Sequence, residues 1–245
     1  MKTNKTILSL ALGAIFTTTS AMADPPPDGW AGTLAGGYVR TAGATTTTAE
    51  NLKGELDYTY KPWRNEFIAS AVNGHSGGNT TAEQYAVGDK LKFNFTDVDY
   101  AFGAVNFDSD RFAGISKNFS ESVGYGRRLL MTEHQVLDAE LGAGVSELQN
   151  VGETGYKTQP IATIGGKYVY TFSPTSQFIQ TLRTEIGSDN TFINPVSTLK
   201  LNIIGALYAA LSYELRYNTT VPDNTRHSDT ITSISFGYGF GGAKP

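Results

Sequence analysis

The chain contains no cysteine among its 245 residues. This excludes a disulfide framework, thiol catalysis and metal sites that use cysteine ligands. The absence suits an oxidising envelope compartment, where an unpaired thiol is a liability. Histidine is scarce as well, because His75, His134 and His227 are the only three.

Positive charge is also in deficit, with 19 Lys and Arg against 23 Asp and Glu. No basic stripe is present, so nothing indicates a nucleic-acid partner. Beyond the N-terminal region, the sequence has no apolar run long enough for a transmembrane helix, which needs about 20 residues.

The N-terminus has the features of a secretory signal. Lys2 and Lys5 precede an uncharged apolar run over residues 7–16, and Ala21-Met22-Ala23 supplies the small residues that a signal peptidase needs. We expect a signal peptide at 1–23, Sec export and cleavage near Ala23.

The rest of the chain divides by composition. Residues 24–29 carry three successive prolines and are expected to form a stiff extended leader. Residues 30–240 are expected to form one domain, which residues 241–245 follow as a short tail.

The remaining sequence is rich in segments that alternate in polarity. In residues 231–240, one face carries aromatic and apolar side chains and the other carries Ser and Gly. Successive side chains of a strand point to opposite faces, and about twelve segments share this pattern. We therefore predict an all-β fold, a transmembrane antiparallel up-and-down β-barrel of about 12 strands, in the outer membrane of a Gram-negative bacterium. The alternative is a soluble secreted sandwich or a lipocalin-like barrel.

The predicted connections alternate in length. Residues 61–64 and 96–99 form short turns, which we expect on the periplasmic side. Longer outer loops are expected at 74–80, 108–114, 150–156, 187–195 and 218–229. Asp89 does not fit, because its parity with Val87 and Leu91 directs it towards lipid. Either a bulge near Gly88 re-aims it or it lies high in the outer interface.

Charged residues fall on the opposite parity and are therefore expected to face the lumen. Two interpretations stay open: a closed network of ion pairs that links the barrel walls, or a narrow aqueous pore whose charges select solutes. The candidate lumen-facing residues are Lys53, Glu55, Asp57, Lys90, Lys92, Asp138, Glu140, Arg183, Glu185, Lys200, Glu214 and Arg216.

No catalytic, cofactor or metal site is predicted, and the chain is not expected to be an enzyme. His75-Ser76 are adjacent, but adjacency does not give the geometry of a nucleophile and its base. Asp97 with Asp99 and Asp108 with Asp110 are more typical of turn formers than of calcium ligands. The pair Arg127-Arg128 is interpreted as a membrane-interface anchor rather than a contact with lipopolysaccharide phosphates.

Several short motifs resemble a known family. They are Trp30-x-Gly32, Gly78-Asn79-Thr80, Asp110-Arg111-Phe112-x-Gly114 and Gly124-Tyr125-Gly126. Their order and spacing are similar to those of the salt-induced outer membrane proteins of Gram-negative bacteria, whose shared region is a domain of unknown function. The resemblance spans residues 30–240. It implies an outer-membrane location and a link to salt stress, but no substrate and no catalytic residue.

The function expected from these observations is a non-enzymatic outer membrane barrel, structural or related to salt and envelope stress, with a narrow or closed lumen. The alternative is a porin-like channel for small solutes or ions. The expected partners are outer-membrane lipid, lipopolysaccharide and the barrel-insertion machinery, which would recognise the C-terminal strand 231–240.

Overall fold

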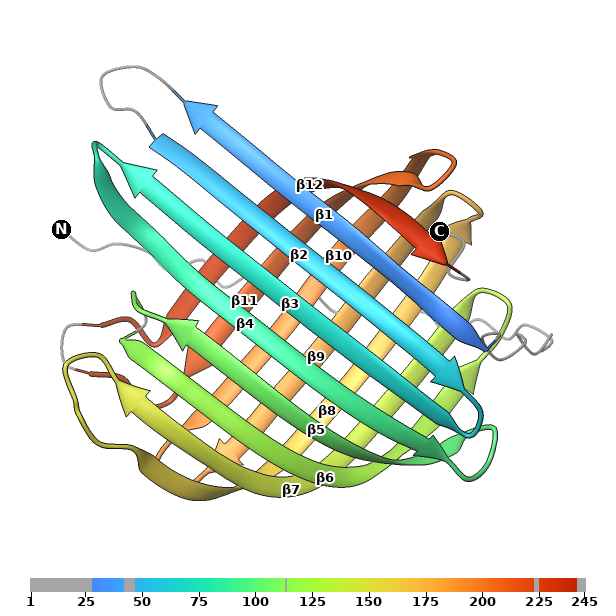
Figure 1. Cartoon of the computed structure of the whole chain (residues 1–245), viewed down its shortest axis with the longest axis horizontal. Coiled ribbons are helices and arrows are strands. Elements are labelled where there is room, and N and C mark those ends of the chain that lie inside the picture. The colour runs from blue at the N-terminus through green and yellow to red at the C-terminus, as the bar shows by residue number, and fades with distance from the viewer. Residues whose placement is uncertain (1–27, 42–46, 113, 223–224, 242–245) are drawn as a thin grey trace, which may run out of the picture.

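The alternating segments form twelve antiparallel strands that close into one barrel, in which each strand pairs with its neighbours in sequence and β1 pairs with β12 (Figure 1). This computed structural model describes residues 28–41, 47–112, 114–222 and 225–241. The fold predicted from the sequence is therefore confirmed. The strands are β1 (Gly29–Thr41), β2 (Thr47–Tyr60), β3 (Trp63–Ser76), β4 (Asn79–Asn94), β5 (Asp99–Asp110), β6 (Ile115–Met131), β7 (Gln135–Asn150), β8 (Lys157–Ser173), β9 (Ser176–Gly187), β10 (Thr191–Ile204), β11 (Leu207–Asn218) and β12 (Ser228–Gly241).

The predicted signal peptide at 1–23 lies outside the described residues, as do positions 24–27 of the leader and 242–245 of the tail. Within the described ranges, no helix is long and apolar enough to cross a membrane.

Large apolar side chains cover the outer surface of the barrel wall. For example, Leu141 of β7 is 62% exposed and Phe236 of β12 is 60% exposed. This arrangement is the reverse of a soluble protein, in which such side chains fill the core. It is the arrangement of outer-membrane barrels, where alternate residues of every strand face lipid.

The two ends of the barrel differ, and both described chain ends lie at the same one (Figure 1). At the short-turn end, β2–β3, β8–β9 and β10–β11 are each joined by two residues. Aromatic pairs ring this end, with centroid distances of 4.4 Å for Trp30–Tyr58 and 4.8 Å for Trp63–Phe93. The opposite end, which carries the longer connections, is called the long-loop end here.

Two expected loops are much shorter than predicted. The segment 74–80 is a tight turn, because β3 continues to Ser76 and β4 begins at Asn79. Gly77 and Gly78 alone make the turn and have φ values of 58° and 83°, which glycine adopts without steric strain.

The segment 187–195 is likewise mostly strand, since β10 begins at Thr191 and includes Pro195. Proline has no N–H to donate to the ladder. Next to the proline, the side-chain amide of Asn194 donates a hydrogen bond to the Leu215 carbonyl of β11 at 3.0 Å. A strand that contains proline is therefore kept in the sheet by a neighbouring side chain.

Asp89 stays on the lipid-facing side. Its pairings with Phe67 on β3 and Val105 on β5 belong to runs without a register shift near Gly88, so the proposed bulge is wrong. Asp89 lies ten residues after the start of β4 and five before its end, nearer the short-turn end than the long-loop end. The carboxylate accepts hydrogen bonds from the Asn65 amide at 3.0 and 3.2 Å.

A few aromatic side chains point into the barrel instead of towards lipid. Tyr100, Phe102, Phe192 and Tyr208 are each less than 8% exposed and form the small apolar parts of the interior. At Gly237, a Cβ would meet the Tyr208 ring at 2.4 Å, so this ring packs directly on the glycine backbone. Most of the remaining interior is polar.

Candidate functional site

The lumen is crossed by ion pairs between strands that are not neighbours in the sheet. Lys90 of β4 pairs with Glu140 of β7, and Arg183 of β9 pairs with Asp108 of β5 at 2.5 Å. In a closed barrel, such strands meet only through the interior. These side chains therefore point inward and bridge the wall.

Near the long-loop end, the ion pairs form a cluster centred on Asp108. Its two carboxylate oxygens bind Arg183 at 2.5 Å and Arg216 at 3.2 Å. Arg216 also contacts Asp110 at 3.5 Å and Glu214 at 3.2 Å. We call Asp108, Asp110, Arg183, Glu185, Glu214 and Arg216 the long-loop cluster.

The long-loop cluster is buried and also reaches β6. The side chains of Asp108 and Arg216 are only 4% and 5% exposed. Glu185 binds Arg183 at 2.9 Å and accepts a 2.7 Å hydrogen bond from Ser120 of β6. Both guanidinium groups lie about 5 Å from the centroid of the Phe192 ring, at 5.1 and 5.2 Å. The cluster thus joins β5, β6, β9 and β11 and leaves little space between them.

A second cluster lies nearer the short-turn end and centres on Glu140. This carboxylate pairs with Lys90, contacts Lys92 at 3.5 Å and accepts a 3.0 Å hydrogen bond from Tyr100. Lys92 also binds Glu66 at 2.9 Å. We call this set, with its flanking pairs, the short-turn cluster; its charged members are Asp57, Arg64, Glu66, Lys90, Lys92, Arg128, Asp138 and Glu140.

The remaining part of the lumen is wetter. Lys53 and Glu55 of β2 form a 2.8 Å ion pair, yet their side chains are 46% and 43% exposed. Lys200 of β10 lies 4.1 Å from the centroid of the Tyr208 ring, and Lys167 of β8 is exposed on the inward face. We call Lys53, Glu55, Lys167 and Lys200 the open side of the lumen.

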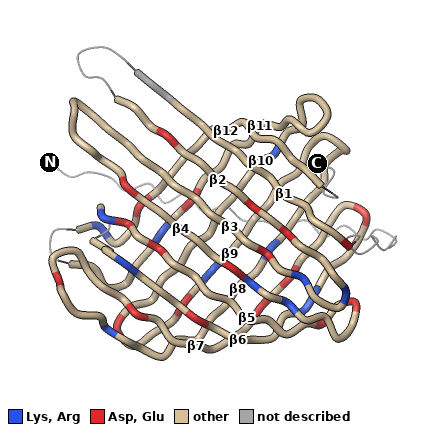
Figure 2. Tube along the Cα trace, viewed as in Figure 1, with Lys and Arg blue, Asp and Glu red and all other residues tan. Residues whose placement is uncertain are grey.

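The structure brings the twelve residues expected from the sequence into these three groups. The predicted set includes four members of the long-loop cluster, five of the short-turn cluster and three of the open side. Figure 2 shows that basic and acidic positions interleave along the strands rather than occupying separate walls.

Six interior charges were not anticipated. Three of them, Arg64, Asp108 and Asp110, fall in segments predicted as turns or loops, although the strands extend to include them. Arg128 lies at the end of an expected strand and is interpreted from the sequence, with Arg127, as a membrane-interface anchor, whereas it binds Asp138 at 2.8 Å on the inward face. Glu66 and Lys167 lie within expected strands, on the parity opposite to Phe67 and Tyr168. The parity rule alone, applied to longer strands, was sufficient to find all six.

The other residues that were considered as catalytic or lipid-binding candidates make different contacts. His75 contacts Thr80 at 3.3 Å and Ser76 contacts Thr47 at 3.4 Å, so the adjacent His and Ser form no nucleophile–base pair. Arg127 binds Asp99 at 3.2 Å at the short-turn end.

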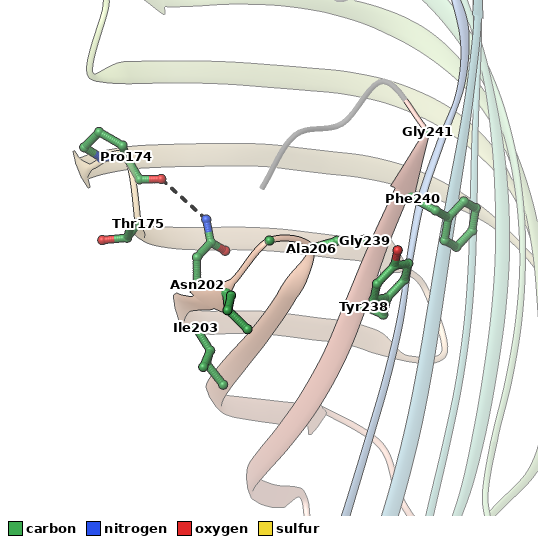
Figure 3. Close-up of a pocket in the computed structure, with 11 residues that line it drawn as sticks. Pro174, Thr175, Asn202, Ile203, Ala206, Tyr238, Gly239, Phe240 and Gly241 are labelled. Atoms are coloured by element: carbon green, nitrogen blue, oxygen red, sulfur yellow. Dashed lines mark hydrogen bonds between the residues drawn. The ribbon is translucent and has the colours of Figure 1, made fainter.

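The described part of the chain has hollows at one rim and in the lumen. The wider one, of about 650 Å³, lies at the rim of the short-turn end, between the β8–β9 and β10–β11 turns and the end of β12. Figure 3 shows Tyr238 and Phe240 on β12 and the Asn202 amide, which donates to the Pro174 carbonyl at 3.4 Å. The narrower one, of about 80 Å³, lies in the lumen beside Lys90, Glu140 and Arg183. The charged residues that line the luminal hollow pair with one another, Lys90 with Glu140 and Arg183 with Glu185.

Comparison with known proteins gives relatives without an assigned activity. The chain is 26% identical over 250 residues to "Uncharacterized protein YdiY" of Escherichia coli (strain K12), which covers 97% of this chain and 98% of that one. Among solved structures, it is similar to the NanC porin (TM-score 0.47, 9% identity, 85% of this chain and 97% of that one). It is also similar to the KdgM porin (TM-score 0.44, 10% identity, 86% and 99%).

A family profile matches residues 35–240, which is most of the described barrel. This match confirms the resemblance that the sequence motifs indicated, to a family defined without a known activity. The chain therefore belongs to the family described as "Protein of unknown function, DUF481".

Proposed function

We propose that this protein is a non-enzymatic barrel of the outer membrane that serves a structural role in the envelope, with a lumen narrowed by ion pairs. The apolar outer wall supports membrane insertion, and the predicted signal peptide supports export. The short-turn end would face the periplasm and the long-loop end the exterior, as in bacterial outer-membrane barrels.

One observation carries this proposal: Asp108 bridges Arg183 and Arg216 across the lumen. This carboxylate is 4% exposed and binds two guanidinium groups, so it links β5, β9 and β11 at one point in the lumen. Buried charges persist only where they are paired, because desolvation of an unpaired ion costs several kcal/mol. The arrangement supports a constricted lumen in preference to a wide solute path.

Conductance and solute uptake test the proposal directly. Protein refolded into planar bilayers is expected to give no current of the size of a wide porin, and vesicles containing it are expected not to swell in disaccharide solutions. A large steady conductance together with disaccharide uptake would refute the constricted lumen.

A second function, a narrow channel for ions or small solutes, is favoured by the exposure of Lys53 and Glu55. Inside the wall, side chains that are 46% and 43% exposed require water next to them. A passage would then run along the open side, past β1, whose inward residues Ala31, Thr33, Ala35 and Gly37 are small or polar.

Blocking that passage separates the two functions. Thr33 faces inward and its hydroxyl donates to Glu55 at 3.5 Å, whereas Leu34 faces lipid and is 56% exposed. If the channel exists, Thr33→Trp abolishes a small steady current and Leu34→Trp leaves it unchanged. Equal currents in the wild type and both variants would contradict a path along the open side.

A further inference from the structure

The open side is more exposed than the long-loop cluster. The side chains of Lys53 and Glu55 are 46% and 43% exposed, whereas those of Asp108 and Arg216 are 4% and 5% exposed. Several inward residues of β1, β11 and β12 next to the open side are small. Ala35 and Gly237 pair in one rung of the sheet, and Ala210 and Ser235 pair two rungs away. The large side chain of Tyr208 packs against Gly237. The exposed side chains of Lys53 and Glu55 beside this wall require water next to them.

The charges of the open side are unbalanced. It contains three lysines and one glutamate, and Glu55 is already paired with Lys53 at 2.8 Å. Within the described residues, neither Lys167 nor Lys200 has an ion-pair partner. The Lys200 ammonium group lies over the Tyr208 ring, at 4.1 Å from its centroid. In the two clusters, by contrast, every base contacts a carboxylate.

These lysines converge although they come from distant strands. Glu55 of β2 interacts electrostatically with Lys53, with Lys167 of β8 and with Lys200 of β10. Lys53 lies in the same rung of the sheet as Ala35, Gly237 and Tyr208, and Lys200 lies over the Tyr208 ring, so both lysines adjoin one aromatic side chain. Strands from opposite sides of the barrel therefore direct their ammonium groups into one region of the lumen.

We propose that the open side is a binding site for small anionic solutes that carry carboxylate or phosphate groups, with Lys167 and Lys200 as the binding residues. Ammonium groups attract such groups through charge-assisted hydrogen bonds, which are stronger than neutral ones. Walls of low dielectric constant strengthen the field of an unbalanced charge inside a narrow lumen. Binding of a solute does not depend on the channel proposed above, because it requires no open path. Only transport of the solute would rest on that channel.

The test uses refolded full-length protein in detergent, with malonate as the anionic probe and malonamide as its neutral counterpart. Calorimetric titration is expected to show binding of malonate and none of malonamide. The double substitution K167Q/K200Q is expected to weaken malonate binding by about tenfold or more, since it removes two hydrogen bonds to a charged group. Lys157→Gln is the matched control, because Lys157 lies on the same strand at the long-loop end, paired with Glu153.

Bilayer recordings distinguish the failure of the site from the failure of the channel. A chloride-selective current that malonate blocks in the wild type but not in K167Q/K200Q supports both. Malonate binding without any current supports the site and refutes the channel. A current that prefers cations, together with equal titrations of malonate and malonamide, refutes the site and leaves the channel standing. Loss of binding in Lys157→Gln as well would also overturn the assignment to the open side.

Discussion

Among single residues, Asp89 is a charge in apolar surroundings. It lies on the lipid-facing side of β4, between Phe67 on β3 and Val105 on β5 in the same rung of the sheet. Its one polar partner is Asn65, at 3.0 Å. A charged side chain on the lipid face of an outer-membrane barrel lowers stability, less for Asp and Glu than for Lys and Arg. Asn65 offsets part of this cost with its amide.

Substitutions at these two positions are predicted to have opposite effects. Asp89→Leu is expected to raise the free energy of unfolding by about 1–2 kcal/mol, because it removes the carboxylate from lipid. Asn65→Leu is expected to lower it by about 1 kcal/mol, because the carboxylate loses its donor. Chemical unfolding of barrels refolded into phospholipid vesicles measures both. Destabilisation by Asp89→Leu would show that this face does not contact hydrocarbon.

At the scale of strands, the ion pairs divide into a buried class and a wet class. Asp108→Asn is expected to lower the free energy of unfolding by about 3–5 kcal/mol, since the buried Arg216 and the half-buried Arg183 lose their shared carboxylate. Glu55→Gln removes an equally short ion pair on the open side, but the expected change is under about 1 kcal/mol, because water solvates both partners. Unfolding in detergent, with far-UV circular dichroism as the readout, compares the two. Similar losses would argue against a lumen with a dry side and a wet side.

The strands also show how far the sequence determines this fold. Period-two alternation located all twelve strands and their pairing, because a slip by one residue would turn every side chain of a strand to the wrong face. Strand ends were less certain. Gly77 and Gly78 make a turn within a polar stretch that has no apolar residue to mark its limits, and Asn194 keeps Pro195 within β10 by a contact that only the folded sheet creates.

The lumen was predictable in composition but not in arrangement. Parity indicated which charges face inward. It did not indicate that Arg183 and Arg216 would meet Asp108, since these partners are 75 and 108 residues apart in sequence. Nor does parity reveal inward aromatic residues, because Tyr100 and Phe102 alternate as lipid-facing residues do. Their direction follows from cross-barrel contacts, such as the hydrogen bond from Tyr100 to Glu140.

For the whole molecule, closure depends on the seam between β1 and β12. The two strands pair over six rungs, from Ala31–Gly241 to Gly36–Phe236, whereas β1 and β2 pair over thirteen. At this short seam, the Phe240 ring covers Gly32. A Cβ on Gly32 would meet that ring at 2.5 Å and the Glu55 carbonyl oxygen at 2.8 Å, so the backbone itself has no room for a side chain.

Gly32→Ala is therefore predicted to weaken closure of the barrel. Overpacking of this kind costs about 1–3 kcal/mol, and here it acts on the pairing that completes the sheet. Gly54→Ala is the matched control, because its Cβ would meet only Leu34, at an ordinary 3.8 Å. Folded and unfolded barrels separate on gels run without heating, so the folded fraction and its melting temperature give the readout. A lower melting temperature in Gly32→Ala alone would place the weak point of the molecule at the seam. Equal behaviour of the two variants would mean that β1 and β12 adjust their spacing freely, and that closure depends instead on the ion pairs inside.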